Sequence, residues 1–268
     1  MGDQIAEAFA ENTDDSAEGK NPASERVSFL KVPIDIVDPD QLGPLAFQLL
    51  ADGKEKNIVL LSLRDLLRAR RNGEYRDYVK QAALVIPISR SIVRGIRFLH
   101  GKQAVRYMPF DFVIRLFTVL EKRELSSYFL GGKKHVLEKA EKNIRATFPA
   151  LRVVGRFPGS FRRQEEATII EAIRKASPSL LLVGKGVRGG ERWIARNTRR
   201  LGKGMRLWCS DLFDVFAERK SHPSQAVFDL GLEWVGYHLQ SPFKLLRFFP
   251  FVYYNILLLL YKARKKSG

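Results

Sequence analysis

Cysteine is almost absent from this sequence, since Cys209 is the only one in 268 residues. A single cysteine excludes an intramolecular disulfide and a cysteine-based zinc cluster, and it is typical of proteins from reducing compartments. Histidine is also rare, and the short spacings of metal ligands are missing between His100, His135, His222 and His238. We therefore expect no metal, no cofactor and a cytoplasmic location.

Acidic residues are scarce as well, 29 against 46 lysines and arginines, which gives a net charge of +17. Seven of the acids fall within residues 1–25, together with one base. A segment this polar cannot bury enough apolar surface to fold, so we expect 1–26 to be a disordered acidic tail, unlike a signal peptide. The remaining chain is strongly basic, which predicts an anionic partner: nucleic acid, a phosphorylated ligand or an anionic membrane surface.

Nucleic acid is the least supported of these partners, because the sequence contains no nucleic-acid-binding motif. The basic clusters also suit solvated helix faces, and they consist of Arg68, Arg70, Arg71, Arg199, Arg200 and Lys203. We therefore expect no nucleic acid as a partner. The sequence leaves the oligomeric state open.

Long hydrophobic runs are missing too. The most apolar segment, 248–261, is shorter than the roughly 20 residues of a spanning helix and contains Pro250 and Asn255. Its aromatic residues and basic flanks favour a segment that lies in the membrane interface, so we expect 223–268 to form a helical, membrane-binding appendage. A core helix, a dimer contact and a single tilted span are the alternatives. The flanking bases are Lys244, Arg247, Lys262, Arg264, Lys265 and Lys266.

Short apolar runs alternate with amphipathic segments between residues 27 and 222. The runs predict a strand and turn within 27–37 and strands at 57–61, 82–86, 127–130, 151–154, 180–183 and 205–209. The amphipathic segments predict helices at 41–50, 63–71, 89–99, 109–122, 134–147, 164–175 and 211–217, and in the appendage at 231–239. We therefore expect 27–222 to be an α/β domain, with a Rossmann-like, largely parallel sheet flanked by helices.

Two glycine-rich turns follow predicted strands. Residues 184–190 stand between the buried run 180–183 and a helix, and Gly131-Gly132-Lys133 follow the run 127–130. Glycine lets a backbone turn sharply and approach a ligand, and the N–H groups of the next helix favour an anion. Each turn is either a phosphate cradle or only a strand-to-helix connection. Both would lie at the carboxyl edge of the sheet, where α/β proteins bind ligands.

The glycine turns belong to a longer series of motifs. In chain order these are Val32-Pro33-Ile34-Asp35; Tyr128-Phe129-Leu130-Gly131-Gly132-Lys133; Gly155 with Gly159-Ser160-Phe161; Leu181-Leu182-Val183-Gly184-Lys185-Gly186 before Glu191-Arg192-Trp193-Ile194-Ala195-Arg196-Asn197; Phe213-Asp214; and Gly231-Leu232-Glu233-Trp234 before Gln240-Ser241-Pro242. The series resembles the WecG/TagA/CpsF family, glycosyltransferase family 26, over roughly residues 27 to 249.

The resemblance implies a bacterial inverting glycosyltransferase at the inner face of the cell membrane. Members transfer N-acetylmannosamine or a related sugar from a UDP donor to a polyprenyl-diphosphate-linked acceptor in cell-surface polysaccharide synthesis. By resemblance, Arg106 is the active-site arginine, Asp111 matches beside it, and Lys244 and Arg247 suit the acceptor diphosphate or the membrane. The donor-binding residues implied are Gly131, Gly132, Lys133, Gly184, Lys185, Gly186 and Glu191.

The sequence departs from the family pattern at the catalytic carboxylate. Where the family has Pro-Asp-Gly, with the aspartate as proposed general base, this chain has Pro87-Ile88-Ser89. The family's Thr-x-Asn motif reads Leu60-Leu61-Ser62, and Gly190 stands in place of a glutamine. An isoleucine cannot accept the proton of an acceptor hydroxyl, so the usual chemistry has lost its base.

Two functions of different classes follow. In the first, the protein is a divergent transferase whose base is recruited elsewhere, and the candidates, each also suited to a helix cap or ion pair, are Asp111, Asp211, Asp214 and Glu191. In the second, it is a non-catalytic relative that binds or scaffolds at a membrane surface. The resemblance favours the transferase, which is the function predicted.

Overall fold

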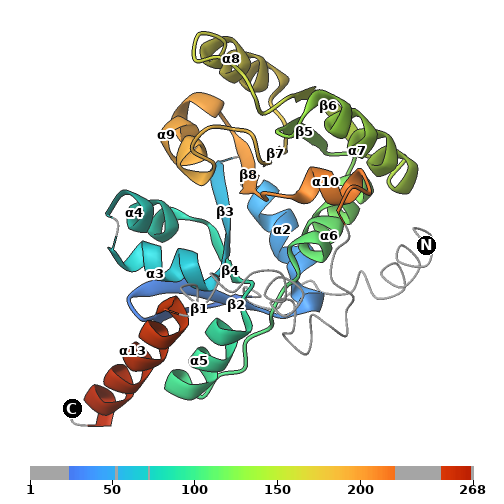
Figure 1. Cartoon of the computed structure of the whole chain (residues 1–268). Coiled ribbons are helices and arrows are strands. Elements are labelled where there is room, and N and C mark those ends of the chain that lie inside the picture. The colour runs from blue at the N-terminus through green and yellow to red at the C-terminus, as the bar shows by residue number, and fades with distance from the viewer. Residues whose placement is uncertain (1–23, 52–53, 72, 221–248, 267–268) are drawn as a thin grey trace.

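The computed structural model describes residues 24–51, 54–71, 73–220 and 249–266. Within them, six parallel strands form one sheet in the order β4-β3-β8-β7-β5-β6 (Figure 1). These strands are β3 (Glu55–Leu61), β4 (Leu84–Pro87), β5 (Ser126–Leu130), β6 (Arg152–Phe157), β7 (Leu180–Val183) and β8 (Gly204–Trp208). A separate antiparallel hairpin consists of β1 (Ser24–Phe29) and β2 (Val32–Val37). The predicted α/β class with a parallel sheet is confirmed.

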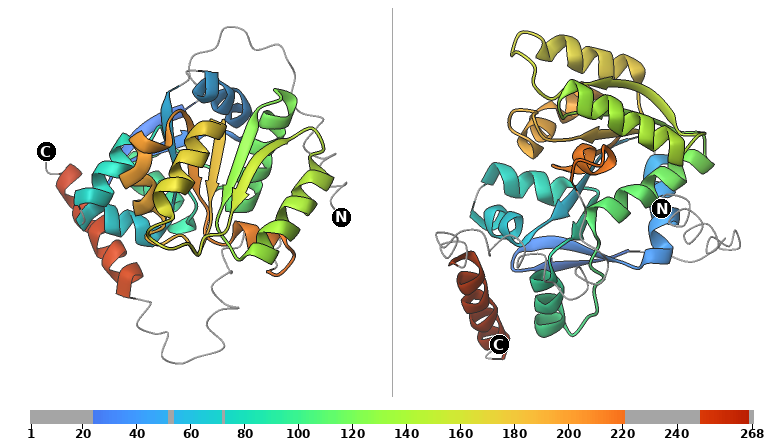
Figure 2. Two further views of the ribbon diagram at one scale, coloured as in Figure 1. Left: turned by 90° about the horizontal axis from the view of Figure 1, so that it is seen from above. Right: turned by 45° about the vertical axis from the view of Figure 1, so that its right-hand side comes forward.

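Helices cover both faces of the sheet (Figure 2). One face carries α3 (Leu63–Arg71), α4 (Gly73–Gln81), α8 (Glu166–Ala176) and α9 (Glu191–Leu201). The other carries α2 (Leu42–Ala51), α6 (Pro109–Lys122), α7 (Lys134–Thr147) and α10 (Leu212–Phe216), with a short 3-10 turn at Pro39–Gln41. The hairpin, α5 (Arg90–His100) and α13 (Phe249–Lys266) pack together beyond β4. The observed bounds of α6 and α7 coincide with the predicted ranges.

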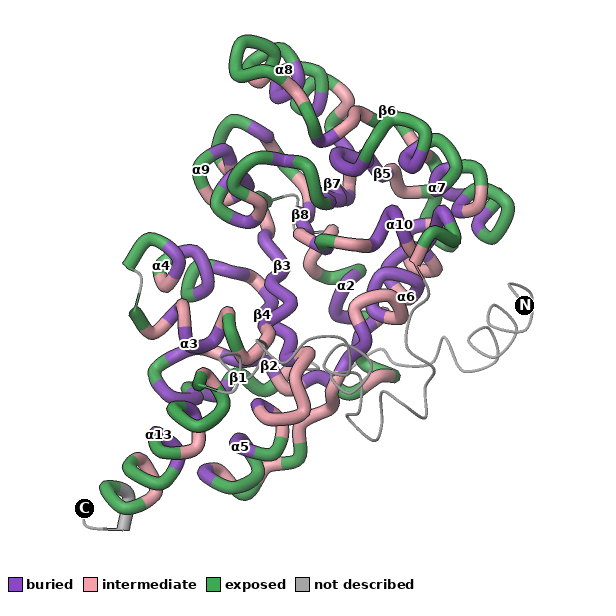
Figure 3. The backbone as a smooth tube through the Cα atoms, viewed as in Figure 1, coloured by how far each residue is buried: buried purple, intermediate pink, exposed green. Residues whose placement is uncertain are grey.

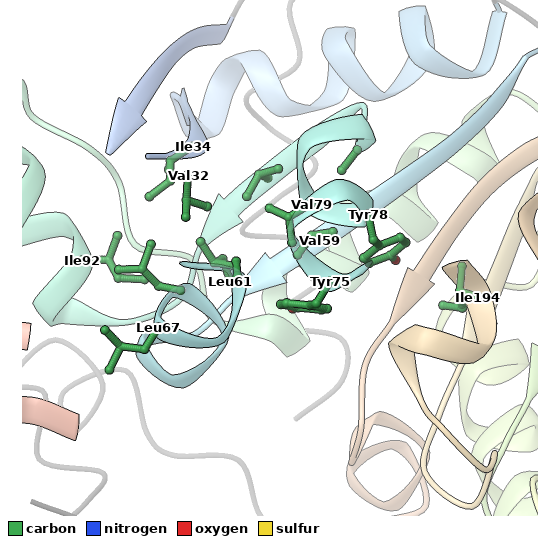
Figure 4. Close-up of a cluster of buried hydrophobic side chains, with 14 of the residues drawn as sticks. Val32, Ile34, Val59, Leu61, Leu67, Tyr75, Tyr78, Val79, Ile92 and Ile194 are labelled. Carbon is green, nitrogen blue, oxygen red and sulfur yellow. The ribbon is translucent and has the colours of Figure 1, made fainter. Parts of the chain in front are cut away.

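Two hydrophobic cores lie on the two faces of the sheet, because successive side chains of each strand point to opposite sides. In β3, Val59 and Leu61 join the core beneath α3, α4 and α9, whereas Ile58 and Leu60 join the core beneath α2 and α6. Figure 3 shows β3, β4, β5 and β7 as mostly buried, whereas the edge strand β6 has no buried residue. Figure 4 shows the first core between the hairpin, α3 and α4, with Ile194 of α9 nearby. The continuous apolar runs seen in the sequence follow from this two-sided burial.

Helix α4 was not predicted. Its buried residues are Tyr75, Tyr78 and Val79, which share one helical face at the spacing i, i+3 and i+4. The segment is short and otherwise polar, so its apolar stripe is weak in the sequence. Tyr75 is held by tertiary contact, since the guanidinium of Arg68 lies 3.9 Å above its ring.

The hairpin closes the edge of the sheet at β4. Its two-residue turn places Leu30 and Lys31 at φ of 50° and 68°, the left-handed conformation that tight hairpins require. Asp35 is buried, accepts a 2.6 Å hydrogen bond from Val85 N and pairs with Arg26 at 2.7 Å. Strand β1 begins within the predicted acidic tail, whose residues 1–23 lie outside the described part, as does the predicted helix 231–239.

Helix α13 rests on α3 and α5 by one face only. Tyr254 is 1% exposed and donates a 2.5 Å hydrogen bond to Ser91 O, and Lys262 donates to Phe98 O at 2.9 Å. The outward face is apolar and exposed; it comprises Phe249, Phe251, Val252, Ile256, Leu259 and Leu260. Across the described residues, no helix combines the length and the hydropathy needed to span a membrane.

Candidate functional site

The candidate site lies at the carboxyl edge of the parallel sheet, where the chain leaves every strand on the same side. The strand order reverses here: β3 leads outward to β4, whereas β5 leads outward to β6 on the other flank, and β7 and β8 fill the middle. Sheets of this kind bind ligands in the crevice at such a reversal. The two glycine turns and the loop after β4, 88–89, all lie at this edge.

The two glycine turns pack directly against each other. Gly132 N donates to Lys185 O at 2.6 Å, and Gly159 N donates to Gly132 O at 2.9 Å. A Cβ on Gly131 would lie 2.7 Å from Gly184 Cα, and a Cβ on Gly159 would lie 2.7 Å from Lys185 O. Glycine is therefore required here because backbone meets backbone.

This packing changes which donors face the site. The N–H groups of Gly131, Gly132 and Gly184 all donate to protein carbonyls, so they are occupied. By contrast, the structure shows no acceptor among the described residues for the N–H groups of Lys134 and His135, in the first turn of α7. The start of α7 is therefore one place at this edge where backbone N–H groups are available to an anion. The assignment of the glycines to donor binding stays a prediction.

Lys185 is neutralised by two carboxylates. Its Nζ lies 2.6 Å from Asp214 Oδ2 and 3.8 Å from Asp211 Oδ1. Asp211 is also bound by Lys220 at 2.5 Å. Two of the candidate bases are therefore engaged in ion pairs. Lys133, in the other turn, is exposed.

Glu191 takes no part in these ion pairs. Its carboxylate is 9% exposed and lies 3.8 Å from the guanidinium of Arg68 in α3, with Tyr75 of α4 as a further neighbour. Burial, and secondarily the negative charge of Asp65, raises the pKa of Glu191 to about 7. Glu191 is thus a buried carboxyl between α9, α3 and α4.

Arg106 and Ile88 are brought together at the end of β4. Arg106 Nε donates to Ile88 O at 3.0 Å, and this contact fixes the segment before α6 onto the loop that follows β4. Leu63 N donates to Ser89 Oγ at 3.0 Å, so the loops after β3 and β4 are also joined. Asp111 lies in the first turn of α6, half-buried and with its own polar interactions.

Asp65 is the carboxylate at this edge that the sequence reasoning missed. It accepts hydrogen bonds from Ser62 Oγ and, at 3.3 Å, from Ser62 N. It is half-buried, in the first turn of α3, whose first residue, Leu63, is bonded to Ser89. The signal in the sequence was Ser62-x-x-Asp65 directly after a buried strand, the spacing of a helix-capping residue pair.

The profile of the Glycosyl transferase WecG/TagA/CpsF family matches residues 27–268, nearly the whole chain. The chain belongs to this family. The match extends the region of resemblance from 249 to 268 and so includes α13. In this WecG/TagA/CpsF protein the carboxyl edge therefore belongs to a glycosyltransferase fold, with an isoleucine in the loop after β4 and Asp65 in the first turn of α3, directly after β3.

The predicted site residues fall into separate groups in the WecG/TagA/CpsF structure. Residues 131–133 and 184–186 form the joined glycine turns, Arg106 lies at Ile88, and Glu191 lies between helices. Lys244 and Arg247 are outside the described residues. In the part of the chain that the structure describes, no cluster of three or more metal-ligating side chains occurs.

Proposed function

We propose that this WecG/TagA/CpsF protein transfers an N-acetylhexosamine-type sugar from a UDP donor to a polyprenyl-diphosphate-linked acceptor in cell-surface polysaccharide synthesis. The observation that carries the proposal is Asp65, a half-buried carboxylate held by Ser62 at the carboxyl edge. It stands in the first turn of α3, which is joined to the loop Ile88-Ser89 by the bond between Leu63 N and Ser89 Oγ. A carboxylate is thus present one strand away from the isoleucine that replaces the expected base.

In the proposed reaction Asp65 is the general base. The acceptor hydroxyl gives its proton to the carboxylate, and its oxygen attacks the anomeric carbon of the donor sugar as the bond to UDP breaks. The anomeric configuration is inverted, the proton ends on Asp65, and UDP leaves. Ser62 donates to the carboxylate and so orients it for this role.

The departing UDP carries negative charge that the site must stabilise. Arg106 supplies a guanidinium beside Ile88, and the N-terminal turn of α7 supplies N–H groups with the positive end of its helix dipole. Lys133 precedes that turn and is exposed, whereas Lys185 is already paired with Asp214. We therefore assign the diphosphate of the donor to Lys133 and the start of α7, beside the glycine turns.

The acceptor is a lipid, and α13 supports its delivery. The outward apolar face of this helix suits insertion at a membrane interface, with Arg264 and Lys262 at its C-terminal end to attract anionic lipid. We propose a peripheral position at the inner face of the cell membrane. The apolar face would then hold the carboxyl edge near the lipid-linked substrate.

A second candidate function is non-catalytic binding or scaffolding at the membrane. It is favoured by Ile88 at the expected base position and by the neutralisation of Lys185 by Asp214 and Asp211. In this alternative the fold and the apolar helix are kept, while sugar transfer is lost.

Titration calorimetry with UDP and UDP-N-acetylmannosamine separates the two functions at the binding step. The transferase predicts that both bind and that Lys133→Gln weakens UDP about tenfold, through loss of one charged phosphate contact. Lys142→Gln, an exposed lysine further along α7, is the matched control and should leave the affinity unchanged. Failure of both ligands to bind would reject the transferase and favour the scaffold.

A further inference from the structure

A cavity of about 600 Å³ lies between the loop that precedes α8, the turn that precedes α9, and α9 itself. The lining includes Trp193 and Glu166. It also includes four arginines: Arg163, Arg188, Arg196 and Arg200. Its volume falls in the range of small-molecule sites. The family resemblance assigned no role to these arginines.

The four arginines that line the cavity outnumber its one carboxylate, Glu166. Arg196 pairs with Glu74 at 2.9 Å, and Arg200 donates to Asn197. For Arg163 and Arg188, both exposed, the structure shows no ion-pair partner among the described residues. Two guanidinium groups at one cavity are therefore available to an anion.

The single carboxylate of the cavity, Glu166, accepts hydrogen bonds from two other residues of the cavity wall. Glu166 Oε1 accepts a 2.6 Å hydrogen bond from Trp193 Nε1 and a 3.4 Å bond from Asn197 Nδ2. Trp193 is 5% exposed, and its ring contacts Phe161 edge to face with centroids 6.4 Å apart. The wall is thus fixed by packing and hydrogen bonds, which gives the arginines a rigid support.

The cavity adjoins the second half of the glycine turn 184–190 but is separate from the turn 131–133 and from the apolar helix α13. None of residues 131–133 or 184–186 lines it, although Arg188 and Gly189 come from the same turn. Helices α8 and α13 lie at opposite ends of the molecule in Figure 1 and in the right panel of Figure 2. A lipid headgroup held at α13 would therefore be remote from the cavity, and a soluble ligand fits the position better.

We propose that this cavity is a second ligand site, which binds a soluble phosphorylated small molecule carrying at least two negative charges. Guanidinium groups match phosphate oxygens with paired hydrogen bonds, and Arg163 and Arg188 approach from two different loops. The site stands independently of the proposed sugar transfer, because it uses other residues. Its ligand would act beside the turn 184–190 and so in contact with the candidate active edge.

Inorganic diphosphate is the probe, titrated into the full chain by calorimetry with and without saturating UDP. The variant Arg163→Gln/Arg188→Gln should weaken diphosphate binding about 100-fold, roughly tenfold for each charged contact. The matched control is Arg162→Gln/Arg199→Gln, which removes the same charge from exposed neighbours outside the cavity. The control should change affinity less than twofold, and melting temperatures should confirm that both variants fold.

Three results would overturn the proposal. Equal losses in the two double variants would show attraction to the net charge alone. Displacement of diphosphate by UDP would make the cavity part of the donor site, and competition by vesicles containing anionic lipid would make it a headgroup site. If UDP itself does not bind, the proposed transferase fails, while the titration without UDP still decides the cavity.

Discussion

The central residue is Asp65, because it combines partial exposure, a fixed orientation and a place at the carboxyl edge. Ser62 contributes both its hydroxyl and its backbone N–H to the carboxylate. The other candidate bases at this edge are less suited: Asp211 and Asp214 each hold lysine. Glu191 is buried between helices.

The variant Asp65→Asn tests this role. An amide keeps the size and one acceptor oxygen of the side chain but cannot take a proton, so kcat should fall about 10²- to 10⁴-fold while UDP affinity is unchanged. Initial rates of sugar transfer measure kcat, and calorimetry measures the affinity for UDP. Asp77→Asn, an exposed aspartate on α4, is the control with the same change of charge. Equal rates for the two variants would remove Asp65 from the mechanism.

Glu191 gives the protein a pH-dependent stability. Burial raises the pKa of its carboxyl from 4.5 to about 7, so between these values the folded state binds a proton that the unfolded state has lost. The resulting stabilisation is present in full below pH 4.5 and is gone once the pH exceeds about 7. From pH 5 to pH 8 it should decline by about 2 to 3 kcal/mol.

Urea unfolding of Glu191→Gln at pH 5 and pH 8 checks this expectation. Glutamine cannot ionise, so the free energy of unfolding of the variant should not show the decline from pH 5 to pH 8 that Glu191 causes. The stability of the variant relative to the wild type should therefore increase as the pH rises. An identical decline in both proteins would show that Glu191 is charged throughout, in contradiction to its environment.

At the scale of elements, α13 is a helix with one face docked and the other apolar and exposed. Leu259 and Leu260 are 63% and 56% exposed, so charge placed there costs little in folding. The double variant Leu259→Glu/Leu260→Glu should lose most sedimentation with vesicles containing anionic lipid, because two glutamates oppose both insertion and the lipid charge. Phe47→Glu on α2, another exposed apolar residue, is the control. Equal sedimentation of both variants would contradict a membrane role for α13.

The docking of α13 depends on a glycine in α5. A Cβ on Gly95 would collide with Tyr254 Oη and lie 2.6 Å from Phe29 Cζ, whereas nothing lies within 4 Å of a Cβ on Gly73. Gly95→Ala should therefore cost about 1 to 3 kcal/mol and increase hydrogen exchange in α13. Gly73→Ala should leave stability unchanged or raise it. Protection of α13 that is the same in both variants would show that α13 docks independently of this contact.

Helices with a wide apolar stripe in the sequence were predictable. Elements that depend on contacts with residues far away in the sequence were not. Helices α6 and α7 carry wide apolar stripes and start at recognisable positions, so their bounds followed from the sequence. Helix α4 is short and depends on Tyr75 and Tyr78 packing under α3 and α9. The two antiparallel strands of the hairpin likewise rest on a non-glycine turn at Leu30 and Lys31, which no turn signal announces.

At the scale of the whole molecule, the sequence located the candidate edge but not its internal contacts. The glycine turns were identifiable, yet their role depends on β5 and β7 being neighbours, which brings Gly131 against Gly184. Asp65 likewise becomes a candidate base only because the start of α3 is joined to Ser89, in the loop after the neighbouring strand β4. Both contacts join residues that are far apart in the sequence, and hydrophobic periodicity and motif spacing do not predict such contacts.

The surfaces that the basic residues occupy become visible only in the folded molecule. Arg70 and Arg71 lie over the rings of Tyr261 and Tyr253, so part of the α3 cluster packs on α13. In the other basic cluster, Arg200 of α9 lines the cavity. The charge thus serves several distinct surfaces.

The most direct measurement is transfer of labelled sugar from UDP-N-acetylmannosamine and UDP-N-acetylglucosamine to a short-chain polyprenyl-diphosphate-linked acceptor, with the full chain and vesicles containing anionic lipid. We expect a labelled lipid product with inverted anomeric configuration, and its loss in Asp65→Asn. Binding of the UDP-sugars without any labelled lipid product would contradict the proposed sugar transfer and leave membrane binding or scaffolding as the function.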